Sequence, residues 1–280
     1  MVPMKTVTEY RNKKSENIHE KDTKGILSII NEEDCGVAFS VKKELGKIAE
    51  AADVIAEAFK NCGRLFFIGA GTSGRLGIIQ AAECPPTFGT SPEMVQGIIA
   101  GGKESVFSAK EGAEDSEEDG YESVKELLTS QDVLVGVSAS GTTPFVIGGL
   151  RAAKDKGCKT VSVSCNKNMA ISKLADVSID IVVGPEVLTG STRMKSGTAQ
   201  KMVLDMLTTT AMIRIGRVSN NLMTNLKPIS QKLKERAARI VVELTSLKGL
   251  PGAEALKKAE AVLKKNGYDI DKSVSVIKSS

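Results

Sequence analysis

The spacing of hydrophobic and polar positions changes twice along this chain. Up to about residue 61, apolar residues recur at helical spacing in residues 22–30 and 37–61, which predicts helices there. From residue 64 onward, short apolar runs alternate with helical patterns, and after residue 216 only helical patterns are left. We therefore expect an N-terminal arm with helices in residues 1–55, a central domain in residues 56–219 and a helical region in residues 220–280.

The central pattern is typical of an α/β protein. Its strands are rich in Val, Ile and Leu and are separated by helices, which predicts a doubly wound, mostly parallel five-stranded sheet covered on both faces. We expect strands at 64–68, 94–100, 132–137, 160–164 and 177–183, and helices at 73–83, 114–128, 144–156 and 195–216. Three more helices are expected at 228–244, 252–265 and 269–277, while residues 1–20 lack periodicity and predict an extended arm.

Two of the strands run directly into loops of small and hydroxyl residues. Loop 1 is residues 69–74 (GAGTSG), and loop 2 is residues 138–143 (SASGTT), followed by Pro144 at a helix start. The N-terminus of a helix has unpaired backbone N–H groups and a partial positive charge, so each loop suits an oxyanion. Two such loops at the ends of strands in one sheet predict a phosphorylated small-molecule ligand, although a loop that only caps its helix is the alternative for each.

Nucleotide-binding motifs explain loop 1 less well. The loop matches G-x-G-x-x-G, but the next strand ends in residues 98–102 (IIAGG) without the acidic residue that would hold a ribose. A Walker A motif is excluded, because Gly74 is followed by Arg75 and Leu76 where Lys and Ser or Thr are required.

Composition narrows the possible partners. The 280 residues are 41% hydrophobic and carry a net charge of +4 without a basic block, which predicts a soluble globular protein that does not bind nucleic acid. No secretory signal and no apolar run of about 18 residues is present, so we expect a cytoplasmic protein without a membrane partner. Five cysteines without a C-x-x-C pair and one histidine, His19, predict neither a disulfide framework nor a metal site.

Two glutamates are candidates for acid–base chemistry. Glu83 precedes a double proline that we expect to end its helix, and loss of water around a carboxylate with no local partner would raise its pKa enough for it to act as an acid. Glu114 belongs to an acidic run at an expected helix start, where spacing alone does not distinguish it from its neighbours. A solvated surface role is the alternative for both.

A further segment, residues 184–201, combines three glycines and five hydroxyl residues with Arg193, Lys195 and Lys201. This composition suits an anionic sugar or a subunit contact. A flexible loop that caps the following helix is the alternative.

Together these segments resemble the sugar isomerase (SIS) fold and, more narrowly, the N-acetylmuramic acid 6-phosphate etherases, which are relatives of the glucokinase regulatory protein. Six ordered motifs carry the resemblance: residues 68–77, 82–89, 98–102, 111–115, 138–144 and 184–193. The N-terminal segment departs from the family pattern, which resembles Arg-Asn-Pro followed by Ile-Asp, because this chain has Lys13 after Asn12 and His19 after Ile18.

The resemblance implies a lyase that releases D-lactate from the C3 ether of N-acetylmuramic acid 6-phosphate in cell-wall recycling. It implies no metal or organic cofactor, and a homodimer with its site at the subunit interface. Glu83 would protonate the departing lactate oxygen, and Glu114 would be the partner acid or base. The residues expected to bind substrate and phosphate are Gly71, Thr72, Ser73, Ser138, Ser140, Gly141, Thr142, Glu186, Ser191 and Lys195. A sugar-phosphate isomerase using the same loops and a non-catalytic sugar-phosphate sensor are the alternatives.

Overall fold

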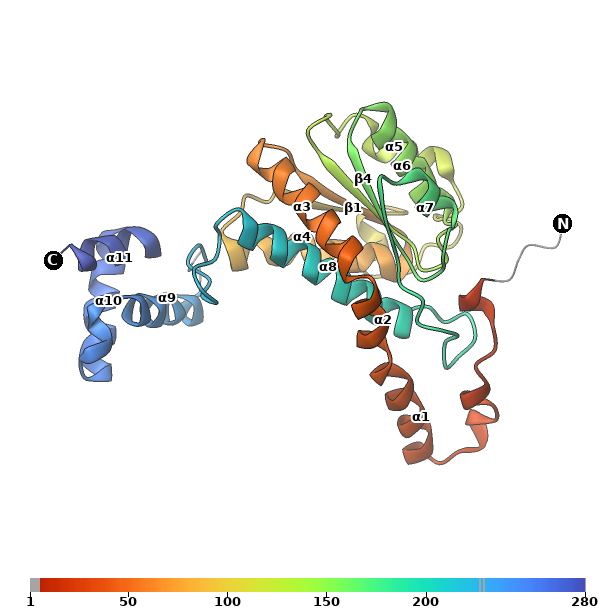
Figure 1. Cartoon of the computed structure of the whole chain (residues 1–280), viewed down its shortest axis with the longest axis horizontal. Helices are drawn as coiled ribbons and strands as arrows, with labels where there is room; N and C mark the ends of the chain where they lie inside the picture. The colour runs from red at the N-terminus through yellow and green to blue at the C-terminus, as the bar shows by residue number, and fades with distance from the viewer. Residues whose placement is uncertain (1–5, 227, 229, 280) are drawn as a thin grey trace. The chain divides into compact units, whose positions relative to one another are not determined.

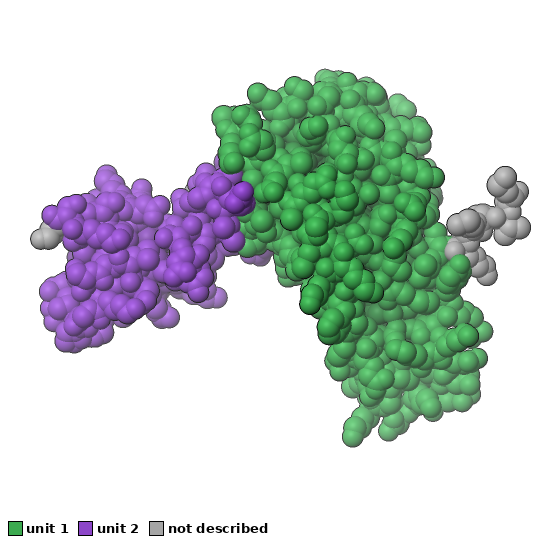
Figure 2. Space-filling view, in the orientation of Figure 1, with its two compact units in different colours: residues 1–81, 93–211 green, residues 82–92, 212–280 purple. Residues whose placement is uncertain are grey.

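The structure, a computed structural model, describes residues 6–226, 228 and 230–279 (Figure 1). The chain divides into two units (Figure 2): unit 1 is residues 1–81 with 93–211, and unit 2 is residues 82–92 with 212–280. Each unit has its own hydrophobic core. The domain boundaries expected near residues 55 and 219 stay a prediction.

Unit 1 contains a five-stranded parallel sheet, as predicted. The strands are β1 (Leu65–Gly69), β2 (Val95–Ile99), β3 (Val133–Val137), β4 (Lys159–Ser164) and β5 (Val177–Asp180), in the order β2-β1-β3-β4-β5. Gly69 is the register partner of Val137. Loops 1 and 2 therefore begin side by side at the carboxyl edge of the sheet, where doubly wound folds bind their ligands.

Helices cover both faces of this sheet (Figure 1). On one face lie α5 (Glu117–Lys125), α6 (Pro144–Asp155) and α7 (Ala170–Leu174), and the first two pack on Phe66, Ile68 and Leu134. On the other face α3 (Leu45–Lys60) contacts β1, β3 and β5. Successive side chains of a strand point to opposite faces, so Phe67 points away from α6 and lies against Gly77 of α4 (Gly71–Phe88).

The start of unit 1 has more local structure than an extended arm. Three short 3-10 turns occupy Val7–Glu9, Lys13–Ser15 and Ile18–Glu20, while residues 1–5 of the predicted arm lie outside the described residues. The expected helices follow as α1 (Thr23–Cys35), α2 (Val37–Lys43) and α3. The remaining elements of unit 1 are the 3-10 turn Lys103–Val106 and α8 (Lys195–Arg214), which continues into unit 2.

Unit 2 is helical, as predicted, with α9 (Gln231–Leu244), α10 (Gly252–Lys265), α11 (Ile270–Lys278) and the 3-10 turn Ser246–Gly249. Its core includes Ile240, Val241 and Leu263. The helix expected from residue 228 begins instead after Ser230, whose hydroxyl accepts a hydrogen bond from the backbone N–H of Leu233. No described helix of the chain meets the length and hydropathy needed to cross a membrane.

The expected end of α4 at the double proline is wrong. The helix runs through Pro85 and Pro86 to Phe88, and the N–H of Gly89 donates to the carbonyl of Pro85 at 3.0 Å. Proline has a φ that fits a helix, and its cost is the lost hydrogen bond to the carbonyl four residues earlier. Gly89 then ends the helix with a φ of +65°.

Candidate active site

Loop 1 meets the beginning of α8. The hydroxyl of Ser73 donates to Gln200 Oε1 at 2.9 Å, and both side chains are buried. A Cβ placed on Gly197 would lie 3.4 Å from the methyl carbon of Thr72. Gly71, with a φ of +51°, stays exposed. The fold therefore brings loop 1 together with the segment 184–201, and it uses the Ser73 hydroxyl for that contact.

Loop 2 is held in shape by its own hydroxyl groups. The Oγ of Ser138 lies 3.2 Å from Ser140 Oγ and 2.7 Å from Thr143 Oγ1, and it accepts a hydrogen bond from the N–H of Gly141 at 3.0 Å. Ser138 is buried, Ser140 is half-buried and Thr142 is exposed. The buried hydroxyl thus organises the loop, while the outer two remain accessible to a ligand.

A cavity of about 160 Å³, here called the loop-1 cavity, lies beside loop 1. Gly71 and Glu114 both line it, together with Arg75, Ser105 and Lys110. Loop 1 and one of the two candidate glutamates therefore share one hollow in unit 1.

Glu114 does not start a helix, contrary to expectation. It lies in a turn, and α5 begins at Glu117 because Ser116 caps that helix by accepting from the N–H of Asp119 at 3.0 Å. The backbone carbonyl of Glu114 accepts from the N–H of Phe145 at 3.1 Å, at the beginning of α6. The Glu114 side chain is exposed, and its backbone lies outside any helix.

Glu83 belongs to unit 2, where it lies on α4 with an exposed side chain. The loss of water that we expected around this carboxylate therefore does not occur within a single chain. The adjacent Cys84 is buried, and burial together with the charge of Glu83 raises the pKa of its thiol to about 12. The thiol is thus protonated at neutral pH.

Glu186 is wholly buried and caps α8. One carboxylate oxygen accepts from the N–H of Lys195 at 3.0 Å, and the other accepts from the N–H and hydroxyl of Ser196 at 2.9 and 2.8 Å. A carboxylate at a helix N-terminus satisfies unpaired N–H groups and complements the helix dipole. Ser191, nearby in the same segment, is half-buried.

Lys195 forms a buried ion pair with Glu33 of α1, and their side chains are only 4% and 9% exposed. Glu33 also accepts from Asn12 at 2.7 Å and pairs with Lys14 at 3.0 Å. Burial raises the pKa of Glu33, but the hydrogen bonds from Lys195, Lys14 and Asn12 outweigh it and lower this pKa to about 2. No local pattern predicts this pairing, because the two residues lie far apart in the chain.

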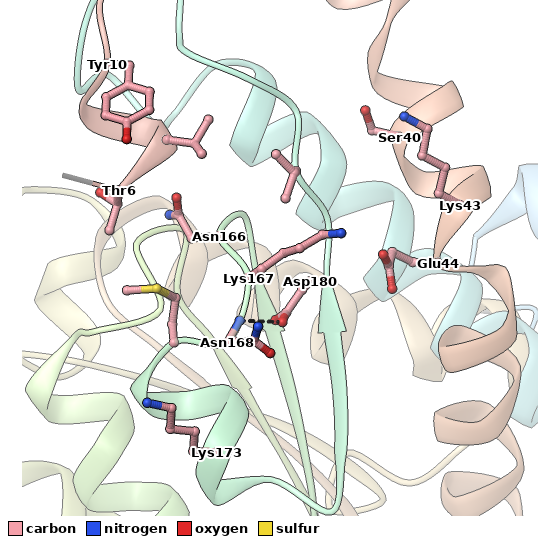
Figure 3. A pocket seen from close by; sticks show the side chains of 13 residues that line it. Thr6, Tyr10, Ser40, Lys43, Glu44, Asn166, Lys167, Asn168, Lys173 and Asp180 are labelled. Atoms are coloured by element: carbon pink, nitrogen blue, oxygen red, sulfur yellow. Dashed lines mark hydrogen bonds between the residues drawn. The ribbon is translucent and has the colours of Figure 1, made fainter. Parts of the chain in front are cut away.

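A larger cavity, of about 1000 Å³, opens elsewhere in unit 1 (Figure 3). The N-terminal segment, the end of α2 and the loop after β4 surround it, and its wall includes Lys43, Lys167 and Asp180. Asp180 accepts from the N–H of Asn168 at 2.9 Å. None of the sequence-predicted site residues lines this cavity. We therefore place the candidate active site at loops 1 and 2, where the predicted binding residues of unit 1 and Glu114 lie, while Glu83 belongs to unit 2.

His19 lies apart from both cavities. Its side chain is 77% exposed, and its Nε2 is 3.7 Å from a carboxylate oxygen of Glu20. His19 is therefore a solvated side chain beside Glu20. Arg75, Ser105 and Lys110 line the loop-1 cavity but were not among the predicted site residues. Arg75 directly follows loop 1 and Lys110 directly precedes the EGAED motif, so these positions could have indicated a site.

The parallel sheet and its two hydroxyl-rich loops define the class of SIS-domain proteins. The family model for the SIS domain matches residues 111–210, and the model for the glucokinase regulatory protein N-terminal SIS domain matches residues 47–154. A phosphoheptose isomerase structure from Francisella tularensis shares the fold with a TM-score of 0.54 and 16% identity, covering 67% of this chain and 96% of that one. The Vibrio vulnificus NanR protein complexed with ManNAc-6P gives a TM-score of 0.51 and 17% identity, covering 82% and 73%.

Curated relatives define the family within this class. An N-acetylmuramic acid 6-phosphate etherase of Clostridium botulinum (strain Hall) is 50% identical over 277 residues, which are 99% of this chain and 89% of the relative. One from Clostridium beijerinckii is 55% identical, covering 90% and 84%, and one from Geobacillus sp. (strain WCH70) is 54% identical, covering 86% and 82%. The chain belongs to the N-acetylmuramic acid 6-phosphate etherase family.

Proposed function

We propose that this chain is a lyase that converts N-acetylmuramic acid 6-phosphate and water into N-acetylglucosamine 6-phosphate and D-lactate. The observation that carries this proposal is the identity of 50–55% to proteins named for this activity, over most of the chain. The neighbouring starts of loops 1 and 2, and the shared cavity of Gly71 and Glu114, support it geometrically.

The first stage of the reaction is an elimination. In the ring-opened sugar the C2 proton is alpha to the C1 aldehyde, so a carboxylate can remove it; we assign this step to Glu114. The electrons of the C2–H bond form the C2–C3 double bond, and the C3–O bond breaks with its electron pair on the lactate oxygen. Glu83, as the acid, donates a proton to that oxygen.

The second stage adds water to the unsaturated aldehyde. The water oxygen bonds to C3, a carboxylate takes the water proton, and a proton returns to C2. One water is consumed, and no electron donor or acceptor is needed. We accordingly propose that the reaction uses no metal and no organic cofactor.

The predicted binding residues divide by their accessibility. Ser140, Thr142 and the backbone of Gly71 and Thr72 are accessible in part or in full, and we propose that they contact the sugar phosphate together with Ser191. The others already form hydrogen bonds or an ion pair within the protein, and we propose that they hold the binding residues in position. They are Ser73, Ser138, Gly141, Glu186 and Lys195.

We further propose a cytoplasmic homodimer that degrades cell-wall amino sugars, with the active site completed at the subunit interface. Glu83 and Glu114 are exposed in the single chain, and efficient proton transfer favours a site that excludes water. Leu27 of α1 and Phe39 of α2 are 60% and 69% exposed, and we propose that a second copy covers them.

The test is to incubate the protein with N-acetylmuramic acid 6-phosphate and to assay free D-lactate enzymatically. We expect release by the wild type and by Glu93→Gln, an exposed control, and loss of release in Glu83→Gln. Solvent deuterium at C2 of the product would support elimination followed by hydration. Isomerised sugar without D-lactate would favour an isomerase, and binding without turnover would favour a sensor; either result overturns the proposal.

A further inference from the structure

Two cations that line the loop-1 cavity, Arg75 and Lys110, have no ion-pair partner in the described part of the chain. Arg75 donates its Nε–H to the backbone carbonyl of Val106 at 2.9 Å. This contact leaves the two terminal amino groups of the guanidinium for a ligand in the cavity. Among the described residues, neither Arg75 nor Lys110 forms an ion pair with a carboxylate, although Glu111 and Glu114 line the same cavity. The two cationic side chains are therefore available to a ligand, although the lining as a whole also holds two carboxylates.

The chemistry of these groups favours a carboxylate. A guanidinium presents its N–H donors as a planar fork that matches two carboxylate oxygens, and a nearby ammonium adds attraction without fixed geometry. The position of Arg75 is defined, because its Nε is tied to Val106 and its backbone belongs to α4. Lys110 lies in the exposed stretch between the 3-10 turn Lys103–Val106 and the turn that holds Glu114.

The size of the cavity limits what can enter it. At about 160 Å³ it is smaller than the roughly 300 Å³ at which pockets begin to hold a whole small-molecule ligand, so it fits one substituent of the substrate. Its walls include Gly71 of loop 1 and Glu114, the proposed base at C2. The groups around C2 are the C1 aldehyde, the acetamido group on C2 and the lactyl ether on C3, and of these the lactyl group alone ends in a carboxylate.

We propose that Arg75 and Lys110 bind the carboxylate of the lactyl group and so select substrates that carry an acid on the C3 ether. This inference rests on the proposed function. Holding the carboxylate fixes the direction of the C3–O bond while Glu114 acts at C2, which makes Arg75 and Lys110 specificity-determining residues. The phosphate is then bound at the opposite end of the sugar, by loop 2.

The test compares the natural substrate with its lactamide analogue, in which an uncharged carboxamide replaces the carboxylate. Wild type, Arg75→Met, Lys110→Met and the control Lys103→Met are assayed for the KM of the natural substrate and the inhibition constant of the analogue. Lys103 is exposed in the 3-10 turn just before this stretch and does not line the cavity. Circular dichroism and urea unfolding of each variant check that it is folded.

We expect the KM of the natural substrate to rise about 10- to 100-fold in Arg75→Met and about 10-fold in Lys110→Met, as for the loss of a charged hydrogen bond. The inhibition constant of the analogue should change less than about threefold, since an amide makes no ion pair in either protein. Lys103→Met should resemble the wild type with both compounds.

Equal losses for the natural substrate and the analogue would overturn the inference, because they would mean that the cations bind the phosphate or only support the fold. An unchanged KM in Lys110→Met and Arg75→Met would overturn it as well. Failure of the proposed function gives a different result, namely no D-lactate from the wild type. Arg75→Lys provides a further check: it keeps the charge but not the fork, so it should recover part of the lost affinity.

Discussion

Replacing Glu33 by glutamine removes the negative charge that pairs with Lys195 and should destabilise the protein strongly. The Lys195 side chain is 4% exposed, so its ammonium would be left buried without a counter-ion. Breaking a buried ion pair from one side costs about 3 to 5 kcal/mol in other proteins. Because glutamine can still accept a hydrogen bond, we expect the free energy of unfolding to fall by about 3 kcal/mol at pH 7.

The pKa of Glu33 gives an independent value for the same contribution. Lowering of this pKa from 4.5 to about 2 corresponds to about 3 kcal/mol, at 1.36 kcal/mol for each tenfold change in proton affinity. The folded protein holds the proton less tightly than the unfolded chain. The stabilisation is therefore complete above pH 4.5 and is lost as the pH falls toward 2.

The assay is urea unfolding followed by circular dichroism, for wild type and Glu33→Gln, at several pH values between 7 and 2. The difference in the free energy of unfolding should be about 3 kcal/mol at pH 7 and should shrink toward zero near pH 2, where the wild-type carboxyl becomes neutral. Asp34→Asn, an exposed change on the same helix, is the control and should show a small difference at every pH. A Glu33→Gln difference that does not vary with pH would refute the reasoning.

Three other substitutions follow from the same kind of contact. Gly141→Ala should lower the free energy of unfolding by about 2 kcal/mol or more, measured by urea titration. The φ of this residue is +75°, and the new Cβ would lie 2.5 Å from the Cβ of Met169. An unchanged free energy of unfolding would contradict this prediction. Asp132→Asn should lower the free energy of unfolding by about 2 kcal/mol, because the 1% exposed carboxylate pairs with Arg64 at 2.7 Å. Burial raises the pKa of Asp132, but the hydrogen bonds from Arg64 and Thr129 outweigh it and lower this pKa; an unchanged melting temperature would argue against the pair. Ser105→Ala should leave the stability unchanged or raise it by about 1 kcal/mol, since the buried hydroxyl has no partner among the described residues; a clear loss would indicate a hidden partner.

The strands and the two hydroxyl-rich loops were predictable from local information. Buried parallel strands need continuous apolar residues, and residues 132–137 supplied them before the hydroxyl-rich loop 2. The adjacency of the loops followed from the topology of a doubly wound sheet, and the register of Gly69 with Val137 confirms it. Pro144 began α6 as predicted, because its missing N–H has no helical partner at that position.

Other features depended on tertiary contacts that local patterns do not contain. The helix end expected before Pro85 gave way because Cys84 and Phe88 are buried and the N–H of Gly89 closes the last turn. The role of Lys195 was expected to be ligand binding, and its buried partner on α1 lies 162 positions away in the chain. Local patterns also could not predict which hydroxyls would be buried. Ser138 and Ser140 are the same residue type, and they differ only in burial.

The carboxylate of Glu186 gives the start of α8 an anion that belongs to the chain itself. Because it is covalently tethered only nine residues before the helix begins, it competes with any free anion at an effective concentration far above that of a metabolite in solution. Under the proposed function, phosphate mimics designed as inhibitors should therefore be aimed at the accessible hydroxyls of loop 2. A compound built to engage the first turn of α8 would first have to displace a resident group that cannot diffuse away.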